Sequence, residues 1–109
     1  MSPMFLGGLT ARAMSIRKDI ELAGHTITEV YPSGLARELG LLDLGYKKSN
    51  RNLLKVGNVV ANHFKIKVDA TKLDDWHHVD ALLCAIIGLR ILGSEARCYG
   101  SREEGQIWV

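Results

Sequence analysis

The chain has 109 residues, a length that suits one domain built around one hydrophobic core. Its hydrophobic fraction of 47% and charged fraction of 24% indicate a globular protein and not a disordered one. The formal net charge of +2 neither demands nor excludes a nucleic-acid partner, so a prediction of nucleic-acid binding depends on where the individual charges lie.

The sequence predicts a cytoplasmic protein that does not enter a membrane. Cys84 and Cys98 are its only cysteines and form no CxxC pair, which fits a reducing compartment. The start MSPMFLGGL lacks the basic region and the long apolar core of a signal peptide. The longest apolar run, ALLCAIIGL, is far too short to cross a bilayer.

The first part of the chain predicts a helix, a strand and a short second helix. Apolar residues at spacings of three and four form one stripe over residues 9–23, typical of an amphipathic helix, and Gly24 follows as its stop. The β-branched residues of HTITEVYP predict a strand over 25–31. Ser33 is placed to cap a short helix, GLARELG, that ends at Gly40.

A polar, loop-like stretch, DLGYKKSNRN, separates this part from the next predicted helix. That helix runs from Leu53 to about His63, with Val56, Val60 and Phe64 directed inward. The segment KIKVD alternates like a short strand, although an extended loop remains the alternative.

The last part of the chain predicts a long helix and a hairpin. Asp74 or Asp75 caps a helix from Trp76 to about Leu92, and Gly93 ends it. The tail EARCYGSREEGQIWV predicts two short strands joined by a glycine-bounded turn.

Two carboxylates occupy positions that suggest chemistry. Glu29 lies near the C-terminal end of the predicted strand, where open α/β sheets bind their ligands. Asp80 lies in the first turns of a helix whose small residues would allow a close approach to the sheet. If the two side chains converge, their oxygens suit Mg²⁺ or Mn²⁺, ions that promote phosphodiester hydrolysis. Taken singly, Asp80 also reads as a helix-start charge and Glu29 as an exposed edge-strand residue.

The segments LTARAMSIRKDIELAG, TEVYPSGLARELG, YKK, HHVDALLCAIIGL and GSREEGQIWV occur in that order. Together they resemble a family of predicted nucleases with an RNase H-like fold, known chiefly as a domain of unknown function. The resemblance covers nearly the whole chain. It implies that Glu29 and Asp80 are catalytic residues that bind Mg²⁺ or Mn²⁺. It also implies that His77 and His78 are neighbours that assist through proton transfer or substrate contact, while solvent-facing first-turn positions are the alternative for both.

The chain departs from this family at its start. Such folds begin with a three-strand antiparallel meander that carries a leading aspartate, and MSPMFLGG cannot form it. We therefore expect residues 1–109 to be a single domain of the α/β class, a partial RNase H-like fold equivalent to the family's C-terminal portion. It would have a central strand flanked by helices and a C-terminal β-hairpin. The unpaired strand at 25–31 then favours a homo-oligomer, or a partner chain that covers it.

Two functions remain open at this point. The first is a metal-dependent nuclease, or an inactive remnant of one, that acts on nucleic acid. Its possible phosphate contacts are Arg12, Lys47, Lys48 and Arg51, which also read as ordinary solvated surface. The second is a non-enzymatic half-domain that associates with itself or with a partner.

Overall fold

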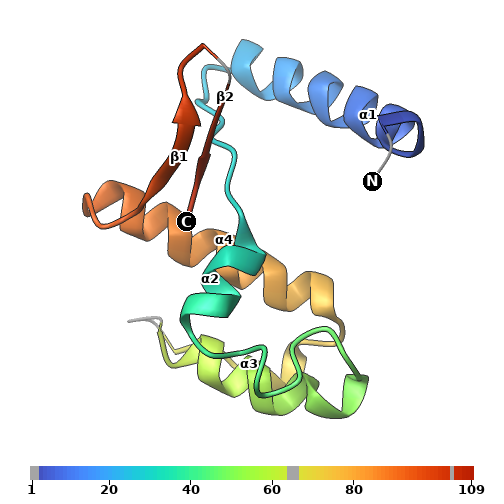
Figure 1. Cartoon of the computed structure of the whole chain (residues 1–109), viewed down its shortest axis with the longest axis vertical. Helices are drawn as coiled ribbons and strands as arrows, with labels where there is room; N and C mark the ends of the chain where they lie inside the picture. The colour runs from blue at the N-terminus through green and yellow to red at the C-terminus, as the bar shows by residue number, and fades with distance from the viewer. Residues whose placement is uncertain (1–2, 64–66, 104) are drawn as a thin grey trace.

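The computed structural model describes residues 3–63, 67–103 and 105–109 (Figure 1). In these residues the chain combines helices with a small antiparallel sheet and is broadly of the α/β class, as predicted. The helices and strands are α1 (Pro3–Leu22), α2 (Pro32–Glu38), α3 (Leu53–Ala61), α4 (Trp76–Leu92), β1 (Cys98–Ser101) and β2 (Gly105–Trp108). Short 3-10 turns at Asn50–Asn52 and Ala70–Lys72 precede α3 and α4.

The helix predictions are confirmed, and α4 has the predicted bounds. Asp75 is its N-cap, because its Oδ1 accepts the backbone N–H of His78 at 2.9 Å. Gly93 ends the helix, as predicted. α1 contains almost all of the predicted 9–23 stretch and begins earlier. α3 matches the predicted helix, and Val56 and Val60 are buried, while Phe64 lies outside the described residues.

The predicted cap of the short helix is wrong. α2 begins at Pro32, and its N-cap Tyr31 makes no side-chain capping bond, while Ser33 lies within the helix. Proline suits the first position because its fixed φ is helical and its missing N–H would have had no helical partner.

The predicted strand over 25–31 is also wrong in extent, and so is its central position between helices. Only Val30 forms a bridge, parallel to Trp108 of β2. The Trp108 N–H donates to the Glu29 carbonyl at 3.0 Å, and the Tyr31 N–H donates to the Trp108 carbonyl at 2.8 Å. Residues 25–29 have no regular secondary structure, and β2, a strand of four residues, bonds to the segment only through Trp108. The described part of KIKVD, residues 67–69, is likewise not a strand.

β1 and β2 form the predicted C-terminal hairpin. They pair antiparallel from Cys98 opposite Trp108 to Ser101 opposite Gly105. Trp108 is therefore paired on both sides, with β1 along one edge and with the end of the 25–31 segment along the other.

The hydrophobic core lies where α2 and α3 pack against α4. Its largest fully buried side chains come from these helices and from the loop after α2: Leu35, Leu41, Val56, Val60, Val79, Leu83 and Ile87. Val109, at the end of the chain, joins the same core and is 4% exposed. The core therefore supports one face of α4, the helix that carries Asp80.

α1 lies apart from α2, α3 and α4 (Figure 1). The described members of its apolar stripe are exposed, Ile16 by 58% and Ile20 by 37%, and so are Met14 and Leu22. The stripe thus has no core to cover within the described residues. None of the described helices combines the length and the apolar character that crossing a membrane requires.

Candidate active site

Asp80 is the most constrained of the predicted site residues. It lies on α4, and its side chain is 19% exposed. The Tyr46 hydroxyl donates a hydrogen bond to Oδ1, and the Lys47 Nζ lies 2.6 Å from Oδ2. Both carboxylate oxygens are therefore engaged by neighbouring residues of one loop, which joins α2 to α3.

The backbone of that loop is bent to present Tyr46 and Lys47 together. Gly45 has φ +89° and Lys47 has φ +61°, both in the left-handed region. A side chain at Gly45 would place its Cβ 2.1 Å from Asn52 Nδ2, and Asn52 Nδ2 donates to the Gly45 carbonyl at 3.4 Å. Glycine is thus required at 45, both for the φ angle and for the contact with Asn52.

The Tyr46 ring is held on two sides. It is 4% exposed and meets the Trp76 ring edge-on, with centroids 5.6 Å apart and planes at 88°. The Lys47 Nζ lies 5.3 Å from the Tyr46 ring centre, within the range of a cation–π contact. The phenol is therefore aimed at Asp80 by packing as well as by its hydrogen bond.

The protonation of these groups follows from their surroundings. Burial raises the pKa of Tyr46, and its hydrogen bond to Asp80 adds to the rise, while the Ser33 side chain lowers it. The hydrogen bond to Asp80 raises the pKa of Lys47. Burial, together with the charge of Asp80, raises the pKa of the Cys84 thiol. At neutral pH the site therefore holds a neutral phenol and a charged ammonium, so Lys47 is an electrostatic group and not a nucleophile.

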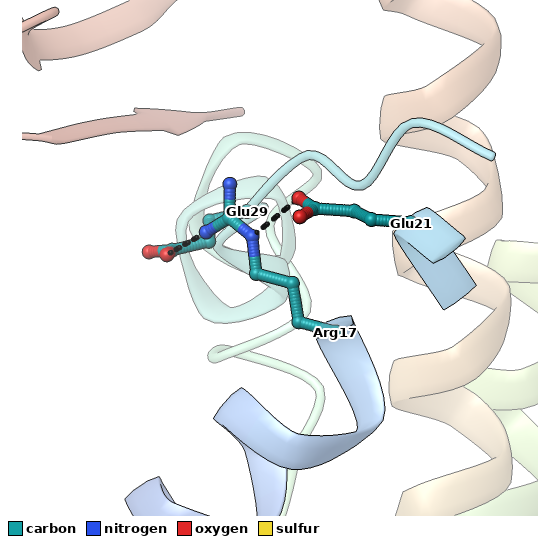
Figure 2. A network of polar contacts seen from close by, with 3 residues as sticks. All are labelled: Arg17, Glu21 and Glu29. Carbon is teal, nitrogen blue, oxygen red and sulfur yellow. Dashed lines mark hydrogen bonds and ion pairs between the residues drawn. The ribbon is translucent and has the colours of Figure 1, made fainter. Parts of the chain in front are cut away.

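Glu29 lies in a different setting. Its side chain is 67% exposed, and its Oε1 lies 3.4 Å from Nη1 of Arg17 on α1. Arg17 Nε also pairs with Glu21 at 2.9 Å, so that its guanidinium stands between the two carboxylates (Figure 2). The Arg17–Glu29 contact was not predicted from the sequence; only the i, i+4 spacing of Arg17 and Glu21 could have signalled an ion pair here.

The two predicted metal ligands therefore have different partners: Glu29 pairs with Arg17, and Asp80 pairs with Tyr46 and Lys47. Across residues 3–63, 67–103 and 105–109, no group of three or more His, Cys, Asp or Glu side chains is arranged to hold a metal ion. Asp80 and Glu29 could each give carboxylate oxygens to Mg²⁺ or Mn²⁺, and the remaining ligands would have to be water or groups beyond these residues.

Both predicted histidines lie at the exposed start of α4. His78 Nδ1 accepts the backbone N–H of Asp74 at 2.9 Å, so this ring helps to hold the residues before the helix. His77 is exposed. These placements match the alternative of solvent-facing first-turn positions.

Of the predicted phosphate contacts, Lys47 is the one engaged with the candidate site, through Asp80. Lys48 and Arg51 are exposed on the same loop, and Arg12 is exposed on α1. Lys47 thus gives positive charge beside Asp80, while Lys48 and Arg51 share the stretch of chain between α2 and α3 with it.

Comparison of the sequence with models of protein families and with curated proteins, and of the structure with solved structures, found no match. The function therefore has to be argued from the sequence pattern and from the geometry of the site.

Proposed function

We propose that the chain acts in metal-dependent phosphodiester hydrolysis as a nuclease of the RNase H-like class. The observation that carries the proposal is the Asp80 carboxylate, mostly withdrawn from solvent, with a lysine ammonium 2.6 Å from one oxygen. A carboxylate beside a fixed cation is a pairing that can hold a divalent metal and a phosphate side by side.

In this proposal Asp80 gives an oxygen to Mg²⁺ or Mn²⁺, and Lys47 turns from Asp80 to the substrate phosphate. Tyr46 keeps Asp80 in place through Oδ1. Glu29 supplies a second carboxylate, and a second polypeptide or a second copy supplies the remaining acidic ligand. The order of the segments that resemble RNase H-like nucleases supports the proposal.

The proposal is tested by cleavage of single-stranded and duplex DNA and RNA with Mg²⁺ or Mn²⁺. We expect Asp80→Asn to lower the metal-dependent rate by roughly 100-fold or more, since even the partners of metal ligands are worth about 10- to 100-fold. Asp43→Asn is the matched control, because Asp43 is an exposed carboxylate on the same loop as Lys47. Equal rates for the two variants, or no metal-dependent cleavage by the native chain, would contradict the proposal.

The exposed apolar side chains of α1 favour a second candidate function, self-association without chemistry. Ile16 and Ile20 lie one turn apart on the same face of α1 and are exposed by 58% and 37%, and neighbouring exposed apolar side chains of this kind can mark an interface. The end of the 25–31 segment is already bonded to β2, so we place the contact on α1, against the same helix of a second copy.

Sedimentation equilibrium at micromolar concentration tests this association. We expect a dimer for the native chain and a monomer for Ile16→Lys, because a charge would then have to be buried in the interface. Leu54→Lys is the control, since Leu54 is 51% exposed on α3 and outside the proposed contact. A native chain that stays monomeric would count against self-association.

A further inference from the structure

A groove separates α1 from the hairpin on the side of Glu29. Its volume is about 360 Å³, and its walls include Arg17, Glu29, Arg102, Gln106 and Trp108. This volume is at the lower end of the range for sites that hold small molecules, so a compact ligand fits it better than a polymer.

The outer edge of β2 forms one side of the groove, at the point where its main-chain groups have no strand to pair with among the described residues. Arg97 and Val109 exchange two hydrogen bonds of 2.9 Å, so the main-chain groups of Trp108 face away from β1 and bond the segment 29–31. Gln106 lies two residues before Trp108 and opposite Gly100, so its N–H and C=O face the same side. Residues 27–28 form no bridge with Gln106 and line the groove instead.

The charged groups on the walls favour an anion. Arg17 is shared between Glu21 and Glu29, whereas Arg102 has no ion pair in the described part of the chain. The two guanidiniums and the Glu29 carboxylate give the described lining a formal charge of +1. A guanidinium and a main-chain N–H are the donors that phosphate and carboxylate groups accept from most readily.

We propose that this groove binds a small ligand through an oxyanion, a phosphate or a carboxylate. The oxyanion accepts hydrogen bonds from the Arg102 guanidinium and the Gln106 N–H. It also contacts the Arg17 guanidinium, which pairs with Glu29 as well. The site uses neither Asp80 nor a metal ion. It shares Glu29 with the proposed nuclease activity, but it goes beyond that activity and does not require it.

The test is a titration of the ¹⁵N-labelled full chain with inorganic phosphate and, separately, with succinate, at constant ionic strength in chloride. We expect a saturable shift of the Gln106 amide resonance with at least one of the two. The more tightly bound probe then identifies the oxyanion that the site prefers.

Four variants test the assignment of residues. Arg102→Gln should weaken binding by about tenfold or more, the scale of one hydrogen bond to a charged group. Arg37→Gln, which removes the same charge from an exposed position on α2 outside the groove lining, should leave the affinity unchanged. Glu29→Gln should tighten binding, because it releases Arg17, and Asp80→Asn should have no effect.

Absence of a saturable shift with both probes would overturn the proposal, and so would equal weakening by Arg102→Gln and Arg37→Gln. Because Asp80→Asn is expected to lower the cleavage rate by roughly 100-fold or more and to leave binding in the groove unchanged, failure of one proposal can be told from failure of the other.

Discussion

Replacement of Leu83 by alanine is expected to lower the free energy of unfolding by about 2–5 kcal/mol, the range for leucine truncated in a packed core. Leu83 has no exposed surface and belongs to the core in which α4 packs against α2 and α3. Removing its isobutyl group loses apolar burial and leaves a cavity that the surrounding helices fill only in part. Urea denaturation followed by far-UV circular dichroism measures the change.

The matched control is Leu89→Ala on the same helix. Leu89 is 55% exposed, so its truncation should change the free energy of unfolding by no more than about 0.5 kcal/mol. Both substitutions alter helix propensity equally, and their difference therefore reports burial alone. Similar losses for the two variants would mean that α4 does not pack with this face inward.

The elements that could be predicted are those whose signals are local. α4 was predicted at both ends, because an aspartate cap, an apolar run and a terminal glycine all lie within or beside the helix. The hairpin was predictable for the same reason, since its two strands are joined by a short glycine-bounded turn. The prediction that Ser33 caps α2 was wrong because a serine beside a proline suits either the cap or the first turn of a helix. Pro32 favours the first helical position, so α2 begins there.

The strand at 25–31 was mispredicted because a strand depends on its partner. Its β-branched residues favour a strand, but residues 25–29 have no regular secondary structure. Pairing is limited to Val30, because β2 reaches the segment only at Trp108. No local pattern in HTITEVYP contains the length or direction of β2.

Asp80 was singled out from the sequence as a candidate site residue, but the residues that contact it could not be predicted. Tyr46 lies 34 positions earlier, in a polar stretch with no periodicity, and its burial depends on a turn at Gly45 and on contact with Trp76. Lys47 was predicted as a phosphate contact, and the structure adds that it is bound to Asp80. Such pairings follow from the tertiary fold, so no local pattern in the sequence contains them.

Replacement of Tyr46 by phenylalanine is the second large expected effect. It removes the hydroxyl that donates to Asp80 and keeps the ring against Trp76. A hydrogen bond to a charged group contributes about 1.5–3 kcal/mol, so we expect a loss of that order in the free energy of unfolding. Tyr99→Phe is the control, since Tyr99 is 53% exposed and its hydroxyl has no hydrogen bond within the described residues. Equal stability of the two variants would show that the bond to Asp80 does not stabilise the fold.

The same contacts predict how stability changes with pH. The pKa of Tyr46 is raised above its ordinary value of 10.0, and that of Lys47 above 10.5. As the pH rises through these ordinary values, the unfolded chain releases protons that the folded chain still holds. The stabilisation is therefore complete below about pH 10 and is lost as the pH rises through the raised pKa values. Denaturation midpoints measured from pH 8 to pH 11 should fall for the native chain, and should fall less for Tyr46→Phe, because one of the two linked protons is then missing. An equally steep fall in that variant would mean that other titratable groups cause the loss of stability at alkaline pH.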